Sequence, residues 1–201
     1  YHSAKDASRN LRLSGKGTKW LNIHSLCSSY LHLIAPNARL ERIYYFSAYA
    51  HHLQQFSPGT VQRHQQYVTC LEDTGVTVEM GRFKRKYIDC TSCGHTMLRH
   101  EEKETDVAMS LKLLEVFISG EADIAVMVTG DTDCAPSIRI AHQLFPGKKI
   151  GIAFPHGRKN GDLVSLADFS FNMSGKNYRN HQFPDPYTLA DGRQIQKPAK
   201  W

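Results

Sequence analysis

Apolar residues recur at helical spacing in five stretches of this chain. We predict helices over residues 20–33, 60–73, 105–119, 137–144 and 161–168. The pattern is clearest in 105–119, where the apolar positions 107, 111, 114 and 118 mark one stripe along the helix. A stripe of this kind normally faces the core, so we expect these four positions to be buried.

Short runs of branched, aromatic and other apolar residues separate these helices. We predict strands over residues 42–50, 76–80, 124–128, 149–154 and 169–173. The run from Ile124 to Val128 is unbroken, which is typical of a strand buried on both faces in a parallel sheet. Strands that alternate with helices predict an α/β fold, a three-layer sandwich with a mostly parallel sheet.

Three parts of the chain differ in composition. Residues 1–174 carry the alternating elements, and we assign them to one domain. Within this domain, residues 81–100 are rich in positive charge, cysteine and histidine, so we expect a small insertion there. From Gly175 onward proline, asparagine and charge dominate. We therefore expect residues 175–201 to form a carboxy-terminal arm outside the core.

The overall composition is that of an ordinary globular protein, with 41% hydrophobic and 22% charged residues among 201. The apolar runs are far too short to span a membrane, and no secretory signal is visible. Five cysteines, an odd number, then indicate reduced thiols and a cytoplasmic location. A net charge of +6 favours a polyanionic partner, and nothing in the composition excludes a homo-oligomer.

Two carboxylates, Asp131 and Asp133, directly follow the 124–128 strand. Ligands of open α/β sheets bind outside the carboxyl ends of the strands, so the position favours a site. Two acids this close repel one another, and a divalent cation is the usual reason to hold them together. The alternative is purely local: Asp133 would cap the next helix and Asp131 would be a turn residue.

A third acid, Asp106, lies in the first turn of the 105–119 helix. By itself it is equally explained as a charge that complements the helix dipole, with Thr105 as the cap. The sequence pattern alone therefore leaves open whether Asp106 belongs to a site.

Two motifs in order change this interpretation: Glu101-Glu-Lys-Glu-Thr-Asp-Val-Ala-Met-Ser, and then Val128-Thr-Gly-Asp-Thr-Asp-Cys-Ala-Pro. Together they resemble the NYN domain of the PIN-like nuclease superfamily. The similarity continues through Lys149-Ile-Gly-Ile-Ala-Phe-Pro and Asp162-Leu-Val-Ser-Leu-Ala-Asp, and so covers most of residues 20–173. The resemblance implies a Rossmann-like sheet with an acidic pocket that binds Mg²⁺ or Mn²⁺ and hydrolyses RNA. The acids that match the family motif, as catalytic residues and metal ligands, are Asp106, Asp131 and Asp133.

The amino terminus departs from that family. There, a first acid stands at the end of the first strand, in a motif like Ile-Asp-Gly-Asn-Asn-Leu, just ahead of a segment resembling Tyr1-His2-Ser3. We therefore expect a fragment that lacks its first strand and one metal ligand, and that need not be active alone. A structure should show either a slot beside the 124–128 strand or the 43–49 strand moved in to close it. In both cases Tyr1 should lie near Asp131.

Four candidate zinc ligands lie within the insertion: Cys90, Cys93, His95 and His100. A Cys-x-x-Cys turn followed by glycine commonly presents two thiolates to one ion. The histidine spacing is tight, so a ligand from elsewhere could replace one of them. A redox pair and two incidental thiols are the alternatives, although a thioredoxin-like pattern is missing.

Two basic segments are candidate contacts for RNA, most simply for a single strand. The residues are Arg82, Lys84, Arg85 and Lys86 in the insertion, and Arg158 and Lys159 after the 149–154 strand. Phe83 and Tyr87 could stack on bases. The alternative is that these charges form a solvated face without a partner.

The leading functional hypothesis is a metal-dependent ribonuclease. A second is a catalytically inactive module of the same fold that binds RNA or protein. A third is a phosphatase of the haloacid dehalogenase type, in which Gly130-Asp-Thr-Asp would be the late Mg²⁺ motif. That family also needs an early Asp-x-Asp nucleophile strand, which this sequence does not show.

Overall fold

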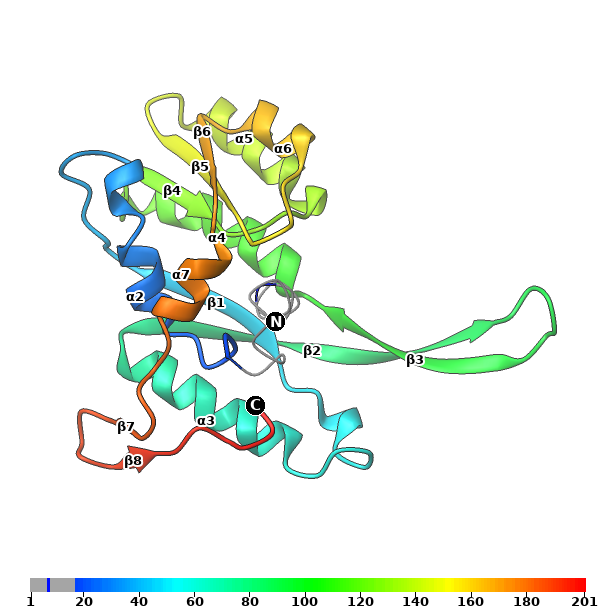
Figure 1. Cartoon of the computed structure of the whole chain (residues 1–201). Helices are drawn as coiled ribbons and strands as arrows, with labels where there is room; N and C mark the ends of the chain where they lie inside the picture. Colours follow the sequence, from blue (N-terminus) through cyan, green and yellow to red (C-terminus); the bar gives the residue numbers. More distant parts are fainter. Residues whose placement is uncertain (1–6, 8–16) are drawn as a thin grey trace.

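The computed structural model describes residue 7 and residues 17–201 (Figure 1). The helices are α2 (Ile23–Ser28), α3 (Thr60–Asp73), α4 (Thr105–Ile118), α5 (Ala135–Leu144), α6 (Gly161–Leu166) and α7 (Gly175–Asn180). The 3-10 turns are η1 (Leu31–Leu33), η2 (His51–Leu53) and η3 (Thr132–Cys134). The strands are β1 (Ile43–Ala48), β2 (Val76–Asp89), β3 (Thr96–Lys103), β4 (Ile124–Met127), β5 (Lys149–Phe154), β6 (Phe169–Asn172), β7 (Tyr187–Thr188) and β8 (Gln194–Ile195).

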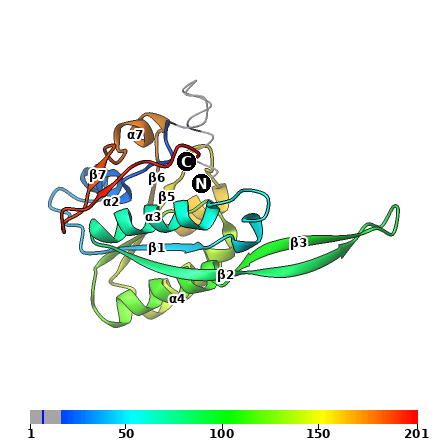
Figure 2. The same cartoon turned by 90° about the horizontal axis from the view of Figure 1, so that it is seen from below.

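The main strands are mostly parallel and are covered by helices on both sides. β1 pairs with β2 in parallel, and β4, β5 and β6 form a second parallel set. α3 lies on one side of β1 and β2, whereas α4 lies on the other (Figure 2). The prediction of an α/β sandwich with a mostly parallel sheet is confirmed. The predicted helix over 20–33 is shorter than expected, because it divides into α2 and η1.

Alternate residues of the central strands pack into different cores, which is why the apolar runs here are continuous. Ile150, Ile152 and Phe154 of β5 join Leu113 and Phe117 of α4 in one cluster. On the opposite face, Ala153 of β5 and Val126 of β4 pack against α2 and α7. Val128, predicted to be buried, is 45% exposed because β4 ends one residue before it.

The stripe predicted for α4 is wrong. Val107, Leu111 and Ile118 are 63%, 61% and 72% exposed, whereas Leu113 and Phe117 are buried. The helix is apolar on more than one face, so its periodicity could not decide which face meets the core.

The insertion is a two-stranded ribbon that leaves the body beyond Gly81 (Figures 1 and 2). β2 extends well past the predicted 76–80 strand and pairs with β3 over eight residue pairs, from Arg82↔Lys103 to Asp89↔Thr96. A ribbon of this size is about 26 Å long. A side chain on Gly81 would collide with the Lys103 carbonyl, so this glycine lets the two strands meet where the ribbon starts.

Residues 175–201 pack against the body, which corrects the expectation of an arm outside the core. Tyr178, Phe183 and Leu189 are buried. Phe183 and Trp201 pack around the fully buried Trp20, and the Trp201 indole nitrogen donates to the Lys19 carbonyl at 2.7 Å.

No hydrogen bonds pair β1 with β4 among the described strands, which form two three-stranded sheets and the small β7–β8 pair. β1 has therefore not moved in to pair with β4, so the second expected arrangement is wrong, and an open slot beside the 124–128 strand stays a prediction. Tyr1 lies outside the described residues, so its expected place near Asp131 stays a prediction.

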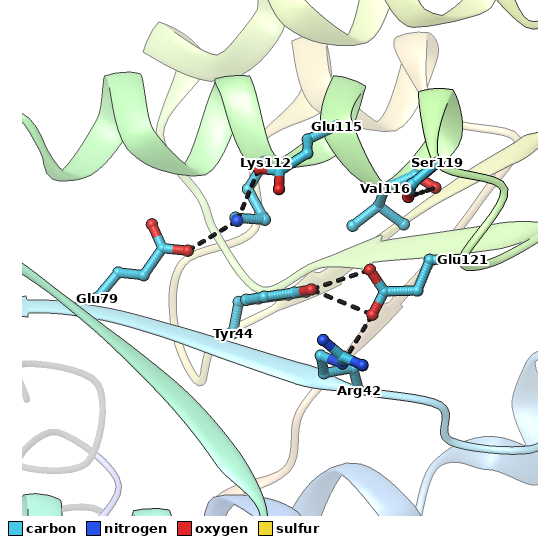
Figure 3. Close-up of polar contacts among 8 residues, drawn as sticks. All are labelled: Arg42, Tyr44, Glu79, Lys112, Glu115, Val116, Ser119 and Glu121. Atoms are coloured by element: carbon cyan, nitrogen blue, oxygen red, sulfur yellow. Dashed lines mark hydrogen bonds and ion pairs between the residues drawn. The ribbon is translucent and has the colours of Figure 1, made fainter.

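A polar network joins the two sheets near the amino ends of β1 and β4 (Figure 3). The Tyr44 hydroxyl donates to both oxygens of Glu121, at 3.1 and 3.0 Å, and Arg42 pairs with the same carboxylate at 2.8 Å. Lys112 of α4 lies over the Tyr44 ring, 4.7 Å from its centroid, and bridges Glu79 and Glu115. Burial first, and then the bond to Glu121, raise the pKa of Tyr44.

Candidate functional site

The turn that follows β4 holds its two aspartates in fixed backbone geometry. The Asp131 amide donates to the buried Thr129 hydroxyl at 3.0 Å, and the Asp131 carboxylate accepts the Asp133 amide at 3.1 Å. Cys134 Sγ donates to the Asp131 carbonyl at 3.0 Å. Asp131 is therefore the cap of η3, so the alternative in which Asp133 caps the next helix is wrong.

Asp106 approaches these two acids from α4, which packs against η3. Burial raises the pKa of Asp106, and the charges of Asp131 and Asp133 raise it further. Because α4 packs against η3, the first turn that carries Asp106 lies on an element in contact with the turn of Asp131 and Asp133, although the three acids lie far apart in the sequence. All three are solvent-exposed, so the cluster is open to a ligand.

The first turn of α4 is strained where the ribbon joins it. Glu104, rather than Thr105, is at the N-cap position and makes no capping bond with its side chain. Its φ of 79° is unusual for a residue with a side chain, and its carboxylate pairs with Arg82 at 2.7 Å. Glu104 and Thr105 also line a cavity of about 140 Å³ with Phe46 and Gly81. This junction orients the helix turn that carries Asp106.

The donor chemistry of the cluster fits a hard divalent cation. Mg²⁺ and Mn²⁺ prefer carboxylate oxygens, and Mg²⁺ typically takes one or two carboxylates while keeping water and substrate phosphate as further ligands. Within residues 17–201, no three His, Cys, Asp or Glu side chains already surround one point. The two or three exposed carboxylates here therefore suit an ion that is shared with a phosphate better than a closed protein cage.

The loop after β5 lies against the turn after β4. A side chain on Gly130 would collide with the backbone of Arg158, so the glycine permits this close approach. Arg158 therefore lies beside the residue that precedes Asp131, as expected from the sequence. Its exposed neighbour Lys159 follows in the same loop.

The family assignment rests on most of the chain. The sequence model of the NYN domain matches residues 9–173. The chain belongs to the NYN domain family.

Two further similarities are weaker. Over 71 residues, 33% of this NYN chain, it is 37% identical to 6-hydroxy-3-succinoylpyridine 3-monooxygenase HspA of Pseudomonas putida, of which the match spans 22%. The crystal structure of VPA0982, a protein of unknown function from Vibrio parahaemolyticus, superposes with a TM-score of 0.50 at 15% identity. That superposition covers 72% of this chain and 76% of VPA0982, and it supports the fold alone.

Strand pairing gives the ribbon of this NYN protein two different faces. Cross-strand partners share a face, so Arg82, Lys84 and Lys86 lie with Lys103, Glu101 and Arg99. Five of these six residues are cationic. The sequence analysis predicted that Arg85 contacts RNA together with Arg82, Lys84 and Lys86. In the structure, Arg85 pairs with His100 on the other face of the ribbon. A depression of about 220 Å³ in the ribbon is nevertheless lined by Arg85 together with Lys84, Lys86, Glu101 and Lys103.

The four candidate zinc ligands do not come together. Cys90 and Cys93 form the ribbon tip, where the backbone amides of Ser92 and Cys93 bond to the Cys90 sulfur and lower its pKa. His100 lies midway along the ribbon instead, opposite Arg85, and stacks on His52 with ring centroids 4.0 Å apart. The predicted set of four ligands is therefore wrong in including His100, because the strand carries it away from the thiols.

The His52 contact anchors the ribbon to the body. The His52 ring stacks on His100 and meets Phe83 edge-on at 4.7 Å, while burial and then the His100 charge lower the pKa of His52. Sequence reasoning missed this contact, and it also missed Thr129 and Gly130 in the acidic turn. Of these residues, only Gly130, which lies between the strand and the two acids, could have been recognised from the sequence.

None of the helices in the described part of the chain has the length and apolar character needed to cross a membrane.

Proposed function

We propose that this NYN protein is a metal-dependent ribonuclease whose site is Asp106, Asp131 and Asp133. The observation that carries the proposal is that α4, which bears Asp106, packs against η3, whose cap Asp131 and whose Asp133 follow the carboxyl end of β4. The charges of Asp131 and Asp133 raise the pKa of Asp106, in keeping with this arrangement. Exposed, mutually repelling carboxylates favour a cation over an empty site. The family assignment supports nuclease chemistry at this position.

A bound Mg²⁺ or Mn²⁺ would activate water and relieve the negative charge on the scissile phosphate. The protein's own residues would orient the carboxylate ligands of the ion and hold the phosphate backbone of the RNA. Thr129 and the Asp133 amide fix the orientation of Asp131, and the α4 junction directs Asp106 toward it. Arg158 and Lys159 lie at the same edge of the sheet, where they would hold the phosphate backbone.

The ribbon supplies a second, longer contact for RNA. Its cationic face, made of Arg82, Lys84, Lys86, Arg99 and Lys103, starts directly before the turn that carries Asp106. Glu101 neutralises part of this charge, because it bonds to Lys86 at 2.6 Å and to Lys103 at 2.9 Å. A single strand that follows this face would enter the acidic cluster from the ribbon side.

The test is metal-dependent cleavage of a short single-stranded RNA by the purified protein. Asp131→Asn should lower the cleavage rate at least about 100-fold, equivalent to about 2.7 kcal/mol in activation free energy. Asparagine can still accept the Asp133 amide, so the turn should survive the substitution.

The matched control is Asp123→Asn, since Asp123 lies at the opposite end of β4, where it pairs with Lys148 at 2.8 Å. This control should cleave like the wild type. Undiminished cleavage by Asp131→Asn would refute the site. RNA binding without cleavage by the wild type would favour an inactive binding module, and turnover of p-nitrophenyl phosphate alone would favour a phosphatase.

A further inference from the structure

The ribbon tip is built like one half of a zinc site. Cys90 and Cys93 flank a tight turn that is closed by two backbone bonds, Cys90 amide to His95 carbonyl at 2.9 Å and Gly94 amide to Cys90 carbonyl at 2.8 Å. Gly94 has a φ of 68°, which permits this turn.

One tip cannot complete the site. Structural zinc almost always has four ligands, and no group of three suitable side chains gathers anywhere in the described part of the chain. The tip also stands away from the body at the end of about 26 Å of ribbon, so the described body cannot fold back to supply the missing ligands (Figure 1).

The surroundings of the tip favour contact with an identical tip. The basic residues of the ribbon end at the Lys86–Arg99 pair. Beyond that pair only Asp89 is charged, and it accepts a bond from Thr96 at 2.6 Å. Exposed apolar side chains surround the tip instead: Tyr87 is 68% exposed, Leu98 48% and Met97 39%. Tyr87 and Leu98 are cross-strand partners on one face, and two tips related by a two-fold axis would bury this face against its copy with little repulsion.

We propose that two copies of this chain bind one zinc ion between their ribbon tips, through Cys90 and Cys93 of each copy. Four thiolates then complete a tetrahedral site, and each half is incomplete without the other. The proposal is independent of nuclease activity. It places the two bodies at opposite ends of a shared rod, so both acidic clusters remain open.

The experiment compares mass and metal content of the full chain purified in reducing buffer with zinc. The wild type should be a dimer by light scattering and contain about one zinc for every two chains. A chelator should halve its mass, and X-ray absorption should show four sulfur ligands. Cys90→Ser with Cys93→Ser should give a folded, zinc-free monomer.

His95→Asn is the matched control, because His95 adjoins the tip but is not assigned as a ligand. It should retain both zinc and the dimer. A zinc-bound monomer would overturn the proposal in favour of a site within one chain, as would loss of zinc in His95→Asn. Zinc-free wild type, a Cys90–Cys93 disulfide in reducing buffer, or a dimer that survives both chelator and cysteine replacement would also overturn it.

Discussion

At the residue scale, a helix-stabilising role does not fully explain the position of Asp106. A first-turn aspartate ordinarily stabilises its helix, because its charge complements the helix dipole. Asp162 in the first turn of α6 is in that situation. Asp106 occupies the same place in α4, but the charges of Asp131 and Asp133 face it. Repulsion and the helix dipole therefore act in opposite directions on Asp106.

This opposition predicts the direction in which the stability changes when the charge of Asp106 is removed. Asp106→Asn should stabilise the metal-free protein by up to about 1 kcal/mol, which raises Tm by about 2–4 °C in a chain of this size. Asp162→Asn, the matched control, should lower Tm slightly. Thermal unfolding with and without Mn²⁺ checks both, because Mn²⁺ should raise Tm more in the wild type than in Asp106→Asn. If Asp106→Asn instead destabilises the protein as Asp162→Asn does, Asp106 is only a helix-dipole residue.

Individual residues show which parts of the candidate sites could be predicted from the sequence and which could not. Asp131 and Asp133 could be assigned because their position after an apolar run has a physical meaning in parallel sheets. Thr129 could not, since a threonine at a strand end is unremarkable until its hydroxyl is seen to hold the Asp131 amide. His100 could not be excluded as a zinc ligand, because sequence spacing does not show that β3 is extended.

At the scale of elements, strands with two buried faces were predictable and the ribbon was not. β5 gives a continuous apolar signal because both its faces are covered. The outer ribbon has solvent on both faces, so residues 82–89 and 96–103 show neither alternation nor an apolar run. Likewise, the apolar pattern of residues 105–119 correctly predicted a helix at α4, but it predicted the wrong face of this helix to be buried.

The two-faced ribbon predicts which charges contact RNA. Lys84 and Arg99 lie in adjacent pairs of the cationic face, and replacing them leaves the Glu101 ion pairs intact. Lys84→Glu with Arg99→Glu should weaken binding of single-stranded RNA. The salt dependence should also fall, by about 0.7 in log–log slope for each phosphate that the variant no longer neutralises. Fluorescence anisotropy across a salt series measures both quantities.

The control for that experiment must change the net charge equally. Lys176→Glu with Arg179→Glu does so on α7, whose exposed residues lie away from the ribbon. This variant should bind RNA nearly as the wild type does. Equal weakening by the two double variants would mean that only net charge matters, and the ribbon would lose its assigned role.

At the scale of the whole molecule, side chains connect what strand pairing leaves unconnected. β1 and β4 belong to separate sheets in the described structure. α4 packs against β1, and its Leu113 and Phe117 also enter the core of the second sheet. The carboxy-terminal segment adds a further connection, since it runs from Tyr178 in one core to Phe183 in another. Isolated aromatic residues of this kind have no period, so their burial could not be predicted from the sequence pattern.

The Tyr44–Glu121 contact is the most direct polar link between the two sheets (Figure 3). Tyr44→Phe removes one hydroxyl and leaves Arg42 paired with Glu121, so it should lower the free energy of unfolding by about 1 kcal/mol. Glu121→Ala should cost more, because it leaves the Tyr44 hydroxyl without its acceptor. Urea unfolding measures both, and combining the two changes should cost less than their sum. Tyr87→Phe on the exposed ribbon is the control and should be neutral. If Tyr44→Phe is equally neutral, the Tyr44–Glu121 bond adds nothing measurable to the packing of α4 and of the carboxy-terminal segment that connects the two sheets.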